Sequence, residues 1–263
     1  MQISGSTALL TGATGGIGHA IAREMSARGA RLILTGRRAE VLGELATELD
    51  ARMLEADLSE PQEVERLLAQ AGDVDILIAN AALPASGRLE TYTTREIERA
   101  LQTNLAAPIA MAHALAPAMV ARATGQLVFI CSLAGKAATP GAPLYSATKH
   151  GIRGFAASLR IDLRGSGVGV STVFPGFIRD AGMYADANIE LPRGVGTRSP
   201  QDVARAVVRA IERNRGEIDV APPALRLGTA LAGIAPELAA STSRRLGADE
   251  IGSAFGRAQR TAR

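Results

Sequence analysis

The segment TGATGGIG at residues 11–18 constrains the fold of this chain more than any other feature. It follows a short apolar run of the β type at residues 7–11 and precedes a helix-periodic stretch from His19 to about Arg28. A strand, a glycine-rich turn and a helix in this order form the phosphate-binding start of a Rossmann unit, where the helix amino terminus offers free N–H groups to a pyrophosphate. The sequence therefore predicts a nucleotide site at this turn.

Three of the four glycines in this segment each meet a separate geometric need. Gly12 permits the tight turn, Gly16 lets the backbone approach a pyrophosphate, and Gly18 lets the helix pack close to the strand. The spacing is Gly-x-x-x-Gly-x-Gly rather than Gly-x-Gly-x-x-Gly, and an ordinary glycine-rich turn is the alternative. We count Thr14 and Ile17, which lie within the turn, among the candidate cofactor contacts.

Two arginines, Arg37 and Arg38, follow the second β-type run at residues 31–36. An NAD site usually has an acidic residue about here, which bonds the ribose hydroxyls, but the first acid after this run is Glu40. Guanidinium groups suit a 2′-phosphate, because they form charge-assisted and often bidentate hydrogen bonds. We therefore expect NADP(H) to be favoured over NAD(H). A solvated loop in an arginine-rich protein is the alternative.

Strand-like and helix-like segments alternate along the rest of the chain. Apolar β-type runs recur at residues 7–11, 31–35, 52–55, 75–79, 126–131, 168–174 and 217–220. Helical patterns fill most of the gaps, at residues 17–28, 39–49, 61–71, 95–122, 143–165 and 200–214. This alternation predicts an α/β fold, a doubly wound parallel sheet (Rossmann fold) in a single domain.

A second group of residues carries candidate acid–base chemistry. Tyr145 and Lys149 stand four apart in a helical segment, so the phenol and the ammonium project from one face. A free tyrosine has a pKa of about 10, and a cation one turn away stabilises its phenolate. Ser132 lies thirteen residues before Tyr145, just past a strand-like run, and its hydroxyl could hold a carbonyl oxygen. Together these groups could interconvert a ketone and an alcohol.

A Tyr-x-x-x-Lys pair alone also occurs on ordinary surface helices. Lysine, however, is nearly absent here, since Lys136 and Lys149 are the only two among 29 basic residues. An amine at position 149, where arginine is the usual cation of this chain, favours a specific role for that amine.

Composition narrows the classes of protein further. Hydrophobic residues make up 47% of the 263 residues, which is typical of a globular chain with a large core. The one cysteine fits a reducing compartment, and the first residues lack the pattern of a signal peptide, so we expect a cytoplasmic protein. We expect no transmembrane segment, because no uninterrupted apolar run reaches the length of a span. We expect no metal site.

Two segments depart from the alternation, and a tail follows them. Residues 175–199 are rich in glycine and proline and are predicted to form a lid loop. The apolar stretch 221–240 is expected to form a helix on a partner subunit or on the lid.

We assign residues 1–240 to the dinucleotide-binding and catalytic domain and residues 241–263 to a basic C-terminal extension. Its five arginines favour a solvated segment over a nucleic-acid or membrane contact, because aromatic residues hardly interleave with them.

Taken together, these residues resemble the classical short-chain dehydrogenase/reductase family over about residues 5–220. The motifs that carry the resemblance occur in the family's order and near its usual spacing. They are TGATGGIG (11–18), ADL (56–58), NAA (80–82), Asn104, Ser132, YSATK (145–149) and PG (175–176).

The resemblance implies a role for each matched position. Asn104, Ser132, Tyr145 and Lys149 would form the catalytic set, with Asn104 holding a water that links Lys149 to solvent. The remaining positions would contact the cofactor. Lys149 would also bind the nicotinamide ribose, and further contacts would come from Asp57 and Leu58 at the adenine, Asn80 and Ala81 beside the adenosine ribose, and Pro175, Gly176 and Ile178 at the nicotinamide. Taken singly, Asp57 could be a helix N-terminal acid and Asn104 an N-cap.

Two positions differ from the family pattern. The family often has two serines where this chain has Cys131 and Ser132, and the spacing to Tyr145 selects Ser132 as the catalytic residue. After Pro175-Gly176 the family commonly has a threonine that bonds the nicotinamide carboxamide, whereas this chain reads FIRDAG. Asp180 or a backbone group would then supply that contact.

We interpret the chain as an NADP(H)-dependent oxidoreductase that interconverts a carbonyl and an alcohol. A hydrophobic ketone, a steroid or a 3-oxoacyl substrate would suit the mostly apolar candidate pocket, which consists of Leu83, Leu133, Ala134, Ala138, Leu144, Phe177, Ile178, Met183 and Tyr184. The alternatives are a non-catalytic NAD(P)-binding regulatory protein and an NAD-dependent alcohol dehydrogenase of the same family. We expect a small-molecule substrate and no nucleic-acid partner.

Assembly is predicted from the helices at about 95–122 and 143–165. Family members commonly pack these helices against their copies, which implies a homodimer or homotetramer. The first helix carries Ile109, Met111, His113, Leu115 and Met119, and the second carries Phe155, Leu159 and Leu163. This apolar surface exceeds what one face on the sheet requires, which favours a symmetric contact.

Overall fold

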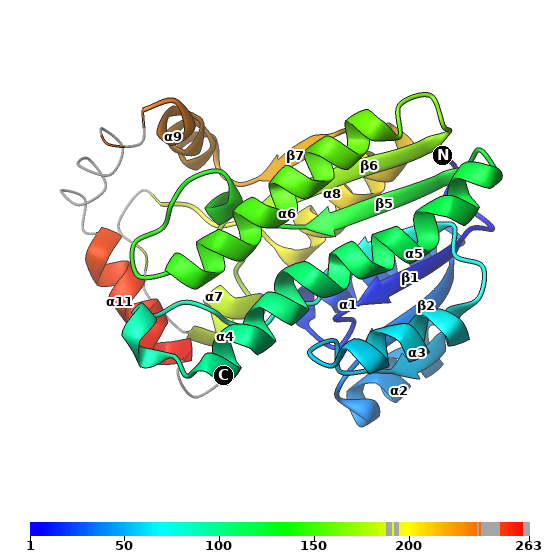
Figure 1. Cartoon of the computed structure of the whole chain (residues 1–263), viewed down its shortest axis with the longest axis horizontal. Helices are drawn as coiled ribbons and strands as arrows, with labels where there is room; N and C mark the ends of the chain where they lie inside the picture. The colour runs from blue at the N-terminus through cyan, green and yellow to red at the C-terminus, as the bar shows by residue number, and fades with distance from the viewer. Residues whose placement is uncertain (188–190, 192–194, 236, 238–247, 260–263) are drawn as a thin grey trace.

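Seven runs of apolar residues form one parallel sheet in the computed structural model, which describes residues 1–187, 191, 195–235, 237 and 248–259 (Figure 1). The strands lie in the order β3-β2-β1-β4-β5-β6-β7. Their bounds are Thr7–Thr11 (β1), Arg31–Gly36 (β2), Arg52–Glu55 (β3), Ile76–Ala79 (β4), Gly125–Ile130 (β5), Val168–Pro175 (β6) and Glu217–Val220 (β7). The predicted doubly wound parallel sheet in a single domain is confirmed.

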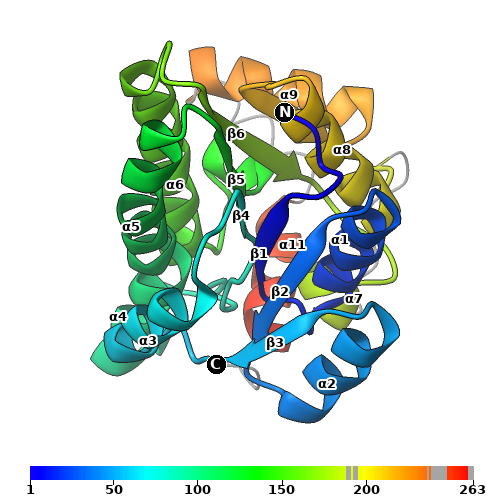
Figure 2. The same ribbon diagram turned by 90° about the vertical axis from the view of Figure 1, so that its right-hand side faces the viewer.

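Helices cover both faces of the sheet, as Figure 2 shows in a view along its edge. One face packs against α1 (Gly16–Ala27), α2 (Ala39–Glu48) and α8 (Pro200–Glu212). The other packs against α3 (Pro61–Ala71), α5 (Ala107–Ala121) and α6 (Pro143–Asp162). Every residue of β4, β5 and β6 is therefore buried, which explains why these strands read as continuous apolar runs rather than alternating ones.

The strand order reverses between β1 and β4, and this switch point places the candidate site. In open parallel sheets, ligands bind outside the carboxyl ends of the strands at such a point. The glycine turn follows β1, Asn80 follows β4, Ser132 follows β5 and Gly176 follows β6. The topology therefore brings residues from four distant parts of the sequence to one edge.

The helix predicted at 95–122 is interrupted. It consists of α4 (Thr94–Leu101), a π-helical turn at Gln102–Ala106 (η2) and α5. A π turn inserts one residue into the helix and often marks a functional site, and hydropathy periodicity does not reveal it. Within the described part of the chain, the helical stretch 94–121 alone has the length and composition of a membrane span, and 39% of its most apolar window is buried inside the protein.

The described part of the chain after β6 also includes the helices α7 (Gly182–Ala187), α9 (Pro223–Ile234) and α11 (Ala248–Gln259). Of the predicted lid loop, residues 188–190 and 192–194 lie outside the described residues. Of the predicted extension, residues 241–247 and 260–263 do as well, so the boundary at residue 240 stays a prediction. Residues 248–259 differ from a solvated segment, because α11 packs beside α7 at the carboxyl edge of the sheet (Figure 1).

Candidate active site

The glycine turn is held by contacts that leave no room for side chains. A Cβ on Gly18 would lie 2.2 Å from the Gly12 carbonyl oxygen, and a Cβ on Gly12 would lie 2.8 Å from the Ala81 Cα. Gly12 also has a φ of +65°, a conformation that favours glycine. The start of α1 thus packs directly on the turn, and the turn lies against the chain that follows β4, as a Rossmann phosphate site requires.

Asn80 and Thr11 lock this turn to the neighbouring strand. The Asn80 Nδ2 atom donates to the carbonyl oxygens of Thr11 and Gly12, at 3.0 and 3.1 Å. The backbone N–H groups of Asn80 and Ala81 both donate to the Thr11 hydroxyl at 3.0 Å. These bonds explain why a polar asparagine directly follows the buried strand β4, because its side chain holds the glycine turn in place.

The two arginines after β2 border the same turn. Arg38 donates from Nη2 to the Thr14 carbonyl oxygen, and Arg37 lies 3.9 Å from the Asp57 carboxylate. Gly36 lies between them and the turn, since a Cβ there would come within 2.9 Å of the Thr14 Cγ2. Both arginine side chains are exposed, so their guanidinium groups lie at an open edge of the site.

Asp57 stands at the end of β3, where the resemblance places the adenine. Burial opposes its ionisation, but hydrogen bonds from Ser59 and the charges of Arg37 and Arg99 outweigh this effect, so the pKa of Asp57 lies below its ordinary value. The carboxylate accepts from the Ser59 N–H at 3.0 Å. Leu58 and Ile178, also expected to contact the cofactor, are buried in the two cores.

The structure brings Tyr145 and Lys149 together on one face of α6. The Lys149 side chain is buried, its Nζ lies 5.5 Å from the centroid of the Tyr145 ring, and it donates to the Ile130 carbonyl oxygen at 3.2 Å. The bond to Ile130, the last residue of β5, fixes the ammonium beneath the phenol. This is the geometry that the four-residue spacing predicts.

Ser132 and Cys131 both follow β5, but they differ in their exposure to solvent. Cys131 is buried and directs its Sγ to the Lys149 carbonyl oxygen at 3.2 Å, and burial raises the pKa of its thiol. Ser132 is partly exposed, and its Oγ accepts from the Ala134 N–H at 3.2 Å. The serine is therefore the one of the two that can present a hydroxyl to a ligand.

Asn104 lies in the π turn and is hydrogen-bonded to the loop after β4. Its Oδ1 accepts from the Leu83 N–H at 2.6 Å and its Nδ2 donates to the Leu83 carbonyl oxygen at 3.0 Å. The side chain is buried, so this paired bond satisfies both of its polar atoms. Asn104 thereby holds in place a loop that also carries Ala85, whose carbonyl oxygen accepts from the Tyr145 N–H at 3.2 Å.

Lys136, the second lysine, joins an ion network beside the Ser132 loop. Its Nζ lies 2.8 Å from Glu217 and 2.7 Å from Asp219, both on β7, and 4.1 Å from the Phe174 ring centroid. Arg153, one turn after Lys149 on α6, also pairs with Glu217 at 2.9 Å. Burial opposes ionisation of Glu217, but these cations outweigh it and hold the pKa of Glu217 below its ordinary value.

The segment after Pro175 packs against the glycine turn. A Cβ on Gly16 would lie 2.5 Å from the Ala181 Cβ, and a Cβ on Gly182 would lie 3.2 Å from Ile17. Asp180 has a φ of +66°, and its largely exposed carboxylate pairs with Arg179 at 3.5 Å. The segment thus contacts the turn through its small residues, whereas the Asp180 side chain lies at the surface.

The structure adds residues of α11, beside two of the predicted pocket residues, that sequence reasoning missed. Phe177 and Tyr184, two of the predicted pocket residues, form an aromatic cluster with Phe255 of α11. Gln259, also on α11, accepts through Oε1 from the Ser86 N–H at 3.0 Å. A lone phenylalanine in an arginine-rich tail gave no clear signal. The other predicted pocket positions range from buried, as Leu133 and Leu144 are, to exposed, as Ala138 is.

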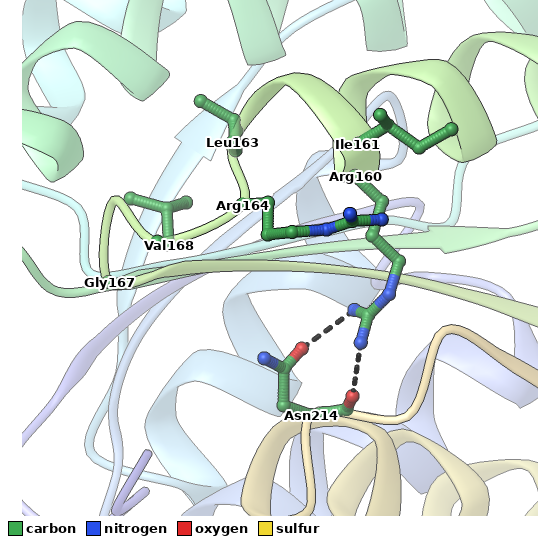
Figure 3. A pocket seen from close by; sticks show the side chains of 8 residues that line it. Arg160, Ile161, Leu163, Arg164, Gly167, Val168 and Asn214 are labelled. Atoms are coloured by element: carbon green, nitrogen blue, oxygen red, sulfur yellow. Dashed lines mark hydrogen bonds between the residues drawn. The ribbon is translucent and has the colours of Figure 1, made fainter.

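A surface hollow of about 410 Å³ lies at the opposite end of the sheet. Figure 3 shows its lining, in which Arg160 donates to the side-chain and backbone oxygens of Asn214. The hollow lies beside Gly167 and Val168, before the amino end of β6, and therefore away from Ser132 and Tyr145.

The residues at the carboxyl edge fit a dinucleotide. The turn has bare backbone at Gly12, Gly16 and Gly18, each a position where a Cβ would collide, and it leads into the amino terminus of α1. No acid lies in the first turn of α1 to repel a phosphate. Pro175 and Gly176 end the site on the other side, where Gly176 contacts Leu133 and Ala221.

Comparisons with known proteins agree with this geometry. Residues 6–191 match the family model described as short chain dehydrogenase. Ketoacyl reductase HetN of Nostoc sp. is 34% identical over 227 residues, which cover 83% of this chain and 79% of the relative. Dehydrogenase/reductase SDR family member 7B of Bos taurus is 31% identical over 261 residues, which cover 90% of this chain and 79% of that relative.

Solved structures show the same likeness. A short-chain dehydrogenase from Sphingobium yanoikuyae in complex with NADPH superposes with a TM-score of 0.76 at 32% identity, over 89% of this chain and 94% of its own. A closed form of serine dehydrogenase complexed with NADP⁺ gives a TM-score of 0.73 at 30% identity, over 82% and 94%. With its glycine turn, its buried lysine beneath a tyrosine and these matches, the chain belongs to the classical short-chain dehydrogenase/reductase family of oxidoreductases.

Proposed function

We propose that this protein is an NADP(H)-dependent oxidoreductase that interconverts a carbonyl and an alcohol on a hydrophobic ketone, a steroid or a 3-oxoacyl thioester. One observation carries the proposal: the buried Lys149 ammonium lies beneath the Tyr145 ring and is held there by the Ile130 carbonyl oxygen. Among the described residues no carboxylate pairs with Lys149, and burial of such a lysine is costly. A role in proton transfer explains why Lys149 lies next to a tyrosine and a partly exposed serine.

Each residue of the set has a separate task in the proposed reaction. The Ser132 hydroxyl donates to the substrate oxygen and orients it. Tyr145 gives its proton to that oxygen during reduction and takes it back during oxidation. The Lys149 ammonium stabilises the phenolate that remains. When bound, the nicotinamide cofactor supplies or accepts the hydride at the carbonyl carbon.

Asn104 orders the loop opposite the tyrosine. Through its two bonds to Leu83 it fixes the chain that reaches Ala85, and Ala85 in turn accepts the backbone N–H of Tyr145. We propose that the π turn around Asn104 also accommodates the water through which Lys149 exchanges protons with solvent.

Arg37 and Arg38 support the preference for NADP(H). Both are exposed at the end of β2, beside the glycine turn, and Glu40 is the first acid that follows them. Their present partners are a carbonyl oxygen and a carboxylate 3.9 Å away, so a 2′-phosphate could recruit both without breaking a buried bond. Two structural neighbours were solved in complex with NADPH and NADP⁺, which agrees with this assignment.

The proposal is tested by a screen of the purified protein. NADPH oxidation is followed with a panel of carbonyls that includes a 3-oxoacyl thioester, an aromatic ketone and a steroid ketone, and the alcohol product is identified. The proposal expects turnover with at least one apolar carbonyl and calorimetric binding of NADP(H) that is tighter than binding of NAD(H). A protein that binds the cofactor but reduces none of the panel would instead favour a non-catalytic NAD(P)-binding role.

A homodimer or homotetramer remains our proposal for the assembly. Of the residues that first suggested it on α5, Met111, Leu115 and Met119 fill the core, whereas Ile109 is only partly buried and His113 is exposed. Three other large apolar side chains on α4, α5 and α6 support it, because Leu101, Val120 and Ile161 are 37%, 39% and 62% exposed. Light scattering that gives the monomer mass of 27.2 kDa across a wide concentration range would contradict it.

A further inference from the structure

Helix α11 sits on two loops through a pair of glycines one turn apart. A Cβ on Gly252 would lie 2.2 Å from the Pro140 carbonyl oxygen, and a Cβ on Gly256 would lie 2.9 Å from the Gly87 Cα. Gly141 contacts the helix as well, because its own Cβ would come within 2.9 Å of Gly252. Small residues at this spacing let a helix approach backbone closely, so α11 is in direct contact with both loops.

These two loops flank the catalytic tyrosine. The first follows β4 and the second precedes α6, and they are joined by a bond of 2.6 Å from the Gly87 N–H to the Gly141 carbonyl oxygen. The Ala85 carbonyl oxygen, in the first loop, accepts the Tyr145 N–H. Gln259 adds a buried bond to the Ser86 N–H. The end of the chain is thus attached to the backbone beside the proton donor.

The same helix directs Phe255 toward the segment that follows β6. The Phe255 ring lies 6.2 Å from the Phe177 ring, with an interplanar angle of 26°, and 6.2 Å from the Tyr184 ring. Phe177 and Tyr184 are themselves 5.4 Å apart. Phe177 comes two residues after Pro175, and Tyr184 lies on α7, so the three rings join the C-terminal helix to the predicted lid.

We propose that α11 forms, within the same chain, the wall of the substrate site remote from the cofactor, and that Phe255 is a specificity-determining residue for the apolar part of the substrate. This inference rests on the proposed carbonyl reduction. The three rings offer a hydrophobic surface, whereas Arg257 on the same helix is exposed. An elongated apolar group, such as the acyl chain of a 3-oxoacyl thioester, matches that surface.

A chain-length series of substrates tests the role of Phe255. Wild type, Phe255→Ala and Phe255→Leu are compared on 3-oxoacyl thioesters of N-acetylcysteamine, from acetoacetyl to 3-oxododecanoyl. We expect Phe255→Ala to raise KM for the longest chain about five- to twentyfold more than it raises KM for the acetoacetyl thioester, because only long chains lose apolar contact. Phe255→Leu, which keeps apolar volume, should fall between the two. An equal change in KM for all lengths, or no change, would overturn the inference.

Fluorescence tests the same wall without turnover. The chain contains no tryptophan, so Phe255→Trp introduces a unique reporter, and Arg257→Trp places a matched control on the exposed side of α11. With NADP⁺ present, which cannot reduce the ketone, 3-oxododecanoyl thioester should shift the emission of Trp at position 255 and leave that at position 257 unchanged. Equal responses, or none at either position, would refute the placement of α11 at the substrate.

The two assays separate failure of the inference from failure of the proposed function. If wild type reduces the thioesters but Phe255 variants show no length dependence, the inference is wrong and the function stands. If wild type reduces no carbonyl, the proposed function is wrong, and the fluorescence response still decides whether α11 borders an apolar ligand.

Discussion

The carboxyl edge of the sheet has a nucleotide side and a proposed substrate side, and the two differ in the kinds of contact that hold them together. On the nucleotide side, backbone meets backbone: Gly12, Gly18 and Gly36 lie against main chain or the short side chain of Thr14, with no space for a Cβ. On the proposed substrate side, close backbone contacts at Gly252 and Gly256 are joined by side-chain contacts between distant segments, as the Phe177 ring makes with Phe255 and the Gln259 side chain makes with the Ser86 N–H. The first kind of contact is encoded within a few residues, whereas the second depends on the whole fold.

This difference in packing matches the different requirements of a cofactor site and a substrate site. Close backbone packing leaves few substitutions open, which suits a site for an invariant cofactor. Contacts between side chains tolerate changes in volume and polarity, which suits a site whose substrate differs between relatives. The proposed catalytic residues lie between the two sides, since Tyr145 bonds to the Ala85 loop and Lys149 bonds to Ile130 at the end of β5.

The largest expected effect falls at that junction and compares the two lysines. Lys149→Ala should lower turnover at least about a hundredfold and also weaken cofactor binding, because its ammonium serves both the phenolate and the ribose. Lys136→Ala should lower the free energy of unfolding, since it removes the cation that Glu217 and Asp219 share and leaves them only Arg153 and Arg226, and it should leave cofactor affinity near wild type. Initial rates, calorimetry and denaturant unfolding measure these quantities. Equal cofactor affinities for the two variants would contradict the assigned roles.

The arginines after β2 test whether side chains matter on the nucleotide side. The double variant Arg37→Ala, Arg38→Ala should lose about 1.5–3 kcal/mol of NADP(H) binding, or about 10- to 100-fold, with little change for NAD(H). Calorimetry with both cofactors measures the change. If the ratio of the two affinities stays at its wild-type value, the 2′-phosphate is bound elsewhere.

Glycine substitutions test the backbone contacts directly. Gly18→Ala would bring its Cβ within 2.2 Å of the Gly12 carbonyl oxygen, so we expect it to cost about 1–3 kcal/mol of stability and to weaken cofactor binding. Gly154→Ala on α6 is the matched control, because nothing lies within 4 Å of its Cβ position, and it should stabilise the protein by about 0.5–1 kcal/mol. Thermal unfolding with and without NADP⁺ follows both. A Gly18→Ala protein with wild-type stability and affinity would show that the turn can relax.

The smallest expected effect is a pH dependence from Glu217. Because its folded pKa is lowered, its pairing stabilises the protein above the unfolded pKa of about 4.3, and this stability is lost as pH falls through the folded value. Glu217→Gln should therefore lower Tm at neutral pH and flatten the loss of Tm in acid. Glu65→Gln on the exposed side of α3 is the control and should change neither. A Glu217→Gln profile parallel to wild type would contradict the assignment.

The sequence predicted local features well. The strand–turn–helix start, the Tyr145–Lys149 face and the position of Ser132 depend on spacings of a few residues, and the structure shows each where periodicity and turn chemistry place it. Cys131 was set aside on spacing alone, and its burial against Lys149 supplies the physical reason.

Features that depend on tertiary packing could not be predicted. The π turn at Gln102–Ala106 leaves the apolar pattern of the helix nearly unchanged, so periodicity does not detect it. The packing of α11 depends on glycines at 87 and 141, far from 252 and 256 in the sequence. Likewise, Met111 and Met119 read as surplus apolar surface but fill the core, because the two faces of a helix cannot be assigned to sheet or solvent from sequence alone.

The central claim, proton transfer by Tyr145 between a carbonyl and an alcohol, is tested most directly by a single-turnover measurement. Wild type and Tyr145→Phe are each saturated with NADPH, as calorimetry establishes, and mixed rapidly with a carbonyl that wild type reduces. The account predicts equal NADPH affinity, loss of NADPH absorbance with one alcohol formed per site in wild type, and a rate lower by about a hundredfold or more in Tyr145→Phe. A Tyr145→Phe protein that keeps more than about a tenth of the wild-type rate would contradict it, since proton transfer of this kind contributes far more.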